Sequence, residues 1–167
     1  MSDLYCLQEL ASQVFMETFS EGNSAKEMSA YISERFSQKQ LFSELSNPLS
    51  QWYFATERGR KLGYLKLNFG SAQTESFDHE AIELERIYVL REFHGKGYGQ
   101  LLLNKAINLS KEYDANFLWL GVWEHNHKAV AFYKKNGFEV FGDHIFQLGN
   151  EKQTDLLMRK FISPLSL

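Results

Sequence analysis

Cysteine and proline are scarce in this 167-residue chain, and positive charges are slightly outnumbered by negative charges. Cys6 is the only cysteine, which excludes an internal disulfide and a cluster of thiolate metal ligands. No apolar run approaches the ~18 residues that a membrane-spanning helix needs, and the N-terminus lacks the basic start and apolar centre of a signal peptide. These absences predict a cytoplasmic protein with no membrane partner.

The charge balance narrows the choice of partner. Lys and Arg number 18 against 21 Asp and Glu, which gives a formal net charge of −3. A general nucleic-acid binder needs a basic face that neutralises phosphates, so direct nucleic-acid binding is not expected. With only two prolines and 44% hydrophobic residues, and with no linker or repeat, the chain is expected to form a single domain over residues 1–167.

Helical periodicity dominates the first third of the chain. Leu4, Leu7 and Ala11 recur on one helix face, and Asn23 or Ser24 is placed to cap a second helix. Strand-forming residues then alternate, interrupted by two further helical segments. The expected helices cover residues 2–19, 24–36, 38–45, 100–111 and 126–135, and the expected strands cover 51–56, 61–69, 81–89, 116–123, 138–148 and 154–161. This order predicts one mixed α/β sheet containing a strand–helix–strand crossover.

Three glycines at every second position, Gly95, Gly97 and Gly99, separate an expected strand from an expected helix. The first N–H groups of a helix have no partner within the helix, and the helix dipole adds partial positive charge, so such a turn can hold a phosphate. Lys96 adds a formal positive charge. The alternative is a turn that only reverses the chain. The spacing matches neither the dinucleotide-binding G-x-G-x-x-G pattern nor a Walker P-loop.

Two linked stretches, "VLREFHGKGYGQLLLNKA" and "LWLGVWEHNHKAVAFYKKNGF", resemble the acetyl-CoA-binding core of the GCN5-related N-acetyltransferase (GNAT) family. The resemblance is closest to the PaiA-type bacterial spermidine/spermine acetyltransferases. It implies an α/β GNAT fold, with a mixed, mostly antiparallel central sheet flanked by helices. The second stretch contains every position of the family pattern: Asn126, Ala129, Phe132, Tyr133, Gly137 and Phe138.

The chain departs from the family pattern at two points. His94 stands where the family usually has Arg or Gln, which would add pH dependence to cofactor binding. The first edge strand of the family is apparently missing, through a natural loss or a truncated start. An exposed sheet edge favours pairing with another chain, so a homodimer is expected.

The resemblance implies a set of acetyl-CoA contacts along the chain. The strand backbone at Ile87, Tyr88 and Val89 would bind the pantetheine arm, and the glycine loop would hold the diphosphate. The expected loop contacts are His94, Gly95, Lys96, Gly97, Tyr98, Gly99 and Gln100, and the other side of the arm would meet Asn126, Ala129, Phe132, Tyr133 and Lys135. No metal is implied. His125 and His127 are separated by one residue, but a zinc site needs more ligands than these two.

The implied reaction is direct transfer of an acetyl group from a thioester to a primary amine. Tyr133 matches the family tyrosine that protonates the departing sulfur, and its alternative role is an ordinary core tyrosine. Glu83 and Glu85 share one face of their strand, so either could accept the amine proton, with Glu85 preferred. Their alternative role is a solvated strand face or an ion pair with Arg86.

A polyamine acceptor needs negative charge along its groove, and the implied substrate contacts are Glu17, Phe19, Glu21 and Glu124. The sequence therefore predicts an acetyl-CoA-dependent polyamine N-acetyltransferase. Two alternatives stay open: the same fold acting on another amine (a protein N-terminus, an amino acid or an antibiotic), or a CoA-binding regulatory protein.

Overall fold

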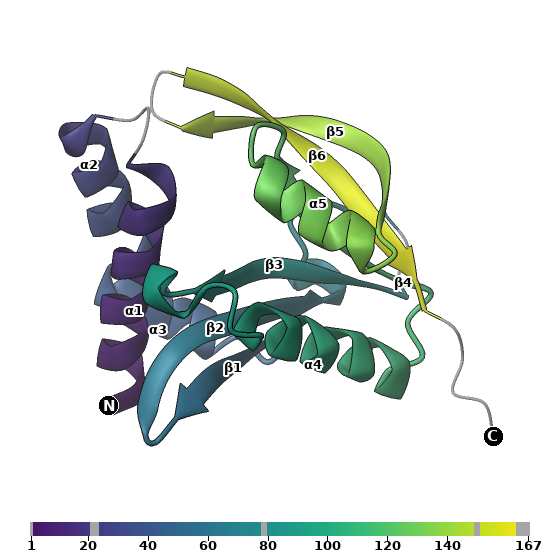
Figure 1. Cartoon of the computed structure of the whole chain (residues 1–167), viewed down its shortest axis with the longest axis horizontal. Helices are drawn as coiled ribbons and strands as arrows, with labels where there is room; N and C mark the ends of the chain where they lie inside the picture. Colours follow the sequence, from purple (N-terminus) through teal and green to yellow (C-terminus); the bar gives the residue numbers. More distant parts are fainter. Residues whose placement is uncertain (1, 21–23, 78–79, 149–150, 163–167) are drawn as a thin grey trace. The chain divides into compact units, whose positions relative to one another are not determined.

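The computed structural model describes residues 2–20, 24–77, 80–148 and 151–162. Its strands form one six-stranded sheet in the order β1-β2-β3-β4-β6-β5 (Figure 1). The chain divides into two compact units, a first unit of residues 1–67 and 86–105 and a second unit of residues 68–85 and 106–167. The single domain expected over residues 1–167 therefore stays a prediction.

The first unit begins with three helices that contact one another, α1 (Ser2–Phe19), α2 (Ala25–Arg35) and α3 (Gln38–Leu45). Phe15 of α1 stacks on Tyr31 of α2 with ring centroids 4.4 Å apart. Ser24 caps α2 in a reciprocal capping box with Glu27, so one of the two predicted caps is confirmed. The other candidate, Asn23, lies outside the described residues. Among residues 2–20 no strand precedes α1.

Two strands and a glycine loop complete the first unit. Strand β1 (Ser50–Glu57) contacts α3 and lies beside β2 (Arg60–Phe69) in the sheet. All residues from Leu62 to Leu67 are buried, which marks β2 as a strand covered on both faces. The 3₁₀ turn η2 (Arg91–Phe93) then leads to α4 (Tyr98–Glu112), whose first turns belong to this unit.

The second unit is built on β4 (Phe117–Trp123), which runs parallel to β3 (Ala81–Val89) and antiparallel to β6 (Glu151–Phe161). Strand β6 pairs in turn with β5 (Glu139–Leu148). The predicted crossover is confirmed, since the parallel strands β3 and β4 are joined through α4. Trp119 is 1% exposed, so its expected place in the core is confirmed.

Helix α5 (His127–Lys135) is fixed at both ends by local hydrogen bonds. Asn126, predicted as the first residue of this helix, is its N-cap. At its other end, Gly137 has φ +83, and its N–H donates to the carbonyl of Lys134 while that of Phe138 donates to Tyr133. These two bonds form a Schellman motif, which requires a left-handed residue and explains the glycine.

Two predicted starts were wrong by two or more residues. Helix α4 starts at Tyr98 instead of residue 100, because the N–H of Leu101 already donates to the carbonyl of Gly97 at 2.9 Å. Strand β6 starts at Glu151 instead of residue 154, because its pairing with β5 continues to the Leu148–Glu151 pair. The turn predicted at Gly149 and Asn150 lies outside the described residues.

Candidate functional site

The glycine loop of the first unit has the backbone of an anion-binding turn. Gly95 and Gly97 have φ +74 and φ +88, a left-handed conformation that glycine adopts without steric cost. A Cβ at either position, or at Gly99, would meet no atom within 4 Å. The loop therefore opens directly onto the first turn of α4, where the unpaired N–H groups of the helix start are available to a phosphate.

Side chains around this loop fix its ends. Nε2 of His94 donates to the carbonyl of Val89 at 2.7 Å, which ties the loop to the end of β3. The hydroxyl of Tyr98 donates to Glu57 at 2.6 Å, and this hydrogen bond raises the pKa of Tyr98. Lys96 is exposed, with its ammonium 4.9 Å from the ring centre of Phe93. Lys96 thus places a cationic side chain on the exposed surface of the loop.

Glu17 and Phe19, two predicted substrate contacts, lie near the end of α1 in the first unit and are half-buried. The carboxylate of Glu17 accepts a hydrogen bond from the backbone N–H of Arg91 at 2.8 Å, and the Arg91 guanidinium donates to the carbonyl of Glu17. Phe19 packs against Phe15, with ring centroids 4.7 Å apart. Glu17 is therefore tied to the turn before the glycine loop. Glu21, the third predicted contact in this region, lies outside the described residues.

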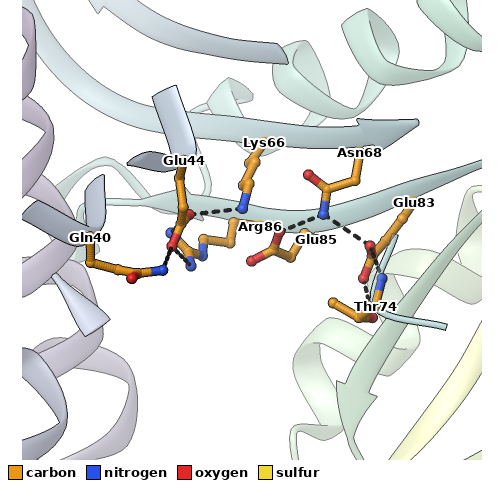
Figure 2. Close-up of polar contacts among 8 residues, drawn as sticks. All are labelled: Gln40, Glu44, Lys66, Asn68, Thr74, Glu83, Glu85 and Arg86. Atoms are coloured by element: carbon orange, nitrogen blue, oxygen red, sulfur yellow. Dashed lines mark hydrogen bonds and ion pairs between the residues drawn. The ribbon is translucent and has the colours of Figure 1, made fainter. Parts of the chain in front are cut away.

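A buried ion cluster stands on β2, β3 and α3 of the first unit. Glu44 accepts from Lys66 at 2.8 Å and lies 3.1 Å from the guanidinium of Arg86, while Gln40 donates to it at 2.9 Å (Figure 2). Burial opposes ionisation of Glu44, but the charges of Arg86 and Lys66 outweigh it and lower its pKa. The cluster holds α3 on the strands.

The carboxylates expected to act as a base are in the second unit. As predicted, Glu83 and Glu85 share a face: the Nδ2 atom of Asn68 donates to Glu83 at 3.0 Å and to Glu85 at 2.5 Å. Thr74 donates to Glu83 twice, from its hydroxyl at 2.6 Å and from its backbone N–H at 2.8 Å (Figure 2). Burial raises the pKa of Glu83; these hydrogen bonds oppose the rise, and the charge of Glu85 adds to it.

Helix α5 presents the other predicted residues of the second unit. The side-chain oxygen of Asn126 accepts from the backbone N–H of Ala129 at 3.2 Å. Tyr133 is 7% exposed and packs against Phe132 and Phe138, with centroid distances of 5.4 and 5.6 Å. Lys135 is exposed at the helix end. The local geometry fits both predicted roles of Tyr133, the acid and the core tyrosine.

Sequence reasoning missed a group of residues on β5, β6 and the loop before β3. His144 and Asp155 are direct partners across the β5–β6 pair, and Nδ1 of His144 lies 3.7 Å from a carboxylate oxygen of Glu75. Burial raises the pKa of Asp155, and His144 opposes this rise. Nothing in the spacing of these three residues links them, because sheet register brings them together.

Gly121 leaves an opening beside this group. It is exposed although its neighbours Leu120 and Val122 are buried, and a Cβ there would lie 3.6 Å from Oδ2 of Asp155 and 3.7 Å from His144. The missing side chain therefore leaves the Asp155 carboxylate accessible from the face of a central strand.

Glu124, the remaining predicted substrate contact, is half-buried and lies 3.9 Å from Nε2 of His125. Over the described residues no group of three or more His, Cys, Asp or Glu side chains could hold a metal ion. Within the same part of the chain, no helix has the length and apolar character needed to cross a membrane.

The first unit also has an open hollow of about 300 Å³, lined by α1, the β1–β2 turn and Leu90. Cys6, Arg60 and Lys61 are among its lining residues. It shares no lining residue with the glycine loop from His94 to Gln100, so it adds nothing to the candidate site.

Comparison with known proteins places the chain in a family. The model of the acetyltransferase (GNAT) family matches residues 9–138, and the chain belongs to this family. The predicted fold class and the superfamily resemblance are confirmed. Members transfer an acetyl group from acetyl-CoA, and the chain is an acetyl-CoA-dependent N-acetyltransferase.

Individual relatives extend this finding. The chain is 37% identical over 151 residues to an "uncharacterized N-acetyltransferase in pepI 3'region" of Lactobacillus delbrueckii subsp. lactis, covering 90% of this chain and 87% of the relative. It is 24% identical over 86 residues to a probable spermine N(1)-acetyltransferase of Bacillus subtilis subsp. natto, covering 51% of this chain and 57% of the relative. The structure of PaiA N-acetyltransferase from Thermoplasma acidophilum in complex with coenzyme A matches with a TM-score of 0.77 and 26% identity, covering 96% of this chain and 93% of that one.

Proposed function

We propose that this enzyme acetylates a primary amine of a polyamine such as spermidine or spermine. The observation that carries the proposal is the concentration of carboxylates in the second unit, where Glu75, Glu83, Glu85 and Asp155 all stand on or beside the sheet face around β3 and β4. A polyamine is a chain of cationic amines, and carboxylates stabilise such a charge. The probable spermine acetyltransferase among the relatives supports this choice of acceptor.

The first unit is proposed to hold the diphosphate of acetyl-CoA. Gly95 and Gly97 leave the backbone open, the start of α4 offers unpaired N–H groups, and Lys96 supplies a positive charge. When bound, acetyl-CoA supplies the thioester carbonyl that the amine attacks. The predicted contacts at Ile87, Tyr88, Val89, Asn126, Ala129, Phe132 and Lys135 are carried forward as part of this proposal.

Two protein groups are proposed to move the protons. An alkylammonium with a pKa near ~10 must lose a proton before it can act as a nucleophile. Glu85 is proposed to accept that proton, since it is half-buried and therefore reachable, whereas Glu83 is 3% exposed. Tyr133 is proposed to donate a proton to the departing sulfur. Tyr133 is carried by α5, and the cap at Asn126 and the Schellman motif fix the two ends of this helix.

Asp155 and Glu75 are proposed to bind a second, non-reacting ammonium of the same polyamine. Gly121 gives access to Asp155, whose carboxylate accepts no hydrogen bond from the described residues. Glu124 is retained as a further contact. Glu17, whose carboxylate also accepts the backbone N–H of Arg91, and Phe19 stay predicted substrate contacts. A homodimer and a cytoplasmic location also stay predictions.

The test is a free-thiol release assay with acetyl-CoA across spermidine, spermine, putrescine, lysine and a peptide panel, with Tyr133→Phe in parallel. We expect turnover on the polyamines, and a kcat reduced by about 10² or more in the variant with CoA affinity unchanged. Turnover on the peptides or on lysine alone would replace the polyamine with another amine. Acetyl-CoA binding with no turnover on any amine would favour the CoA-binding regulatory protein.

A further inference from the structure

Asn68 occupies an unusual position between the two glutamates of β3. Its side chain is fully buried at 0% exposed, and its Nδ2 atom lies 3.0 Å from Oε2 of Glu83 and 2.5 Å from Oε2 of Glu85 (Figure 2). An amide nitrogen carries two protons, so it can donate one to each carboxylate. One neutral side chain thus fixes both acidic groups from the neighbouring strand.

The two carboxylates are otherwise held very differently. Glu83 accepts two further hydrogen bonds from Thr74 and is 3% exposed, so its oxygens are enclosed. Glu85 is half-buried, so solvent reaches part of its side chain. The shared amide therefore joins an anchored carboxylate to an accessible one.

We propose that Asn68 is the positioning residue for amine deprotonation: its N–H groups orient Glu85 as the base, while Glu83 serves as a structural anchor. The inference rests on the proposed function, because it presumes an amine that must lose a proton. It adds a residue from a different strand to the proposed chemistry and decides between the two candidate bases.

The electrostatics explain why a donor is needed at this point. Two carboxylates that share one donor repel each other, and repulsion favours protonation of one of them. Hydrogen bonds donated to the charged form act in the opposite direction. The Asn68 amide thus supplies stabilisation to the Glu83–Glu85 pair directly.

The first test measures the carboxylates without any reaction. Glutamate side chains labelled with ¹³C are titrated by NMR in the unmodified protein, in Asn68→Leu and in Thr74→Val. Asn68→Leu is expected to raise the titration midpoint of Glu85, because its charged form loses a hydrogen-bond donor. Thr74→Val removes one donor to Glu83 alone, so it should move Glu83 and leave Glu85 in place. An unchanged Glu85 midpoint in Asn68→Leu would overturn the proposal.

The second test uses the acetyl-transfer assay with the best acceptor. In Asn68→Leu the acid limb of the kcat/KM profile should move up by the same amount as the Glu85 midpoint, with the KM for acetyl-CoA unchanged. If the acid limb of the kcat/KM profile moves in Thr74→Val but not in Asn68→Leu, the proposal is overturned and Glu83 is favoured as the base. If Asn68→Leu fails to fold, Asn68→Ser keeps one donor and should shift both readouts less, in the same direction.

These experiments separate the two hypotheses. If no amine is acetylated by the unmodified protein, the proposed function fails, while the NMR titration still decides whether Asn68 controls Glu85. If polyamines are acetylated and the Glu85 midpoint does not respond to Asn68→Leu, the proposed function stands and the positioning role fails.

Discussion

The side-chain oxygen of Asn126 accepts the backbone N–H of Ala129 at 3.2 Å, so the family motif Asn-x-x-Ala is a helix cap in this chain. Asn126→Ala should destabilise the fold by about 1 kcal/mol, because the N–H groups at the start of α5 lose their acceptor. Asn126→Asp keeps an acceptor and is the matched control. Chemical denaturation of both variants measures the difference. Equal stabilities of Asn126→Ala and the unmodified protein would show that the cap contributes nothing.

The positive φ of Gly97 predicts a cost for any side chain in the loop. Gly97→Ala should weaken CoA binding about tenfold, since a non-glycine residue in the left-handed region costs roughly 1–2 kcal/mol and the loop would shift to relieve it. Gly59→Ala is the matched control, because Gly59 also has positive φ and open space but lies in the β1–β2 turn. Isothermal titration calorimetry with CoA compares them. The same loss of affinity in both variants would contradict a local role for the loop.

Features carried by neighbouring residues could be predicted from the sequence. The helix cap at Ser24, the left-handed stop at Gly137 and the shared face of Glu83 and Glu85 depend on spacings of a few residues, which the helix and strand periods determine. The resemblance to the GNAT family likewise rested on two short motifs, and the family match bears it out.

Contacts between distant segments could not be predicted in the same way. Asn68 meets Glu83 and Glu85 from another strand, and Glu17 meets Arg91 from 74 residues away along the chain. His144 faces Asp155 only because of the β5–β6 register. Register depends on the packing of the whole sheet, so a single sequence does not reveal which polar residues become partners.

The ion cluster around Glu44 predicts a large effect of a small substitution. Glu44→Gln removes the buried carboxylate charge that Lys66 and Arg86 both contact, and should destabilise the protein by about 3 kcal/mol. Glu139→Gln breaks the exposed pair with Arg159 and should cost no more than about 1 kcal/mol. Urea unfolding at pH 7 gives both values. A cost for Glu44→Gln as small as that of the control would refute the buried cluster as a stabilising element.

The same cluster has a defined pH dependence. The pKa of Glu44 is lowered in the folded state, so its contribution is present above the unfolded pKa near 4.5 and is lost as the pH falls through the lower, folded value. The stability difference between the unmodified protein and Glu44→Gln should therefore shrink below about pH 4.5. Unfolding curves recorded between pH 7 and pH 3 follow it. A difference that stays constant over this range would argue that the carboxylate charge is not the stabilising feature.

Asp155 is the residue whose charge should matter most for a second ammonium. Asp155→Asn should raise the KM for spermidine about tenfold with little change in kcat, because the proposed contact is to the non-reacting ammonium and acts through charge. Asp143→Asn is the matched control, since Asp143 is exposed and is the residue next to His144 on β5. Steady-state kinetics at pH 7 compare the two.

The raised pKa of Asp155 sets the direction of the pH effect. Because burial favours its protonated form, Asp155 loses its charge at a higher pH than an ordinary aspartate, and the KM for spermidine should rise as the pH is lowered toward 5. In Asp155→Asn that rise should be smaller, since the titrating carboxylate is gone. A monoamine of similar size, which has no second ammonium, should show no difference between the two proteins. An equal loss of affinity for the monoamine would mean that Asp155 shapes the face around Gly121 and does not bind the distal charge.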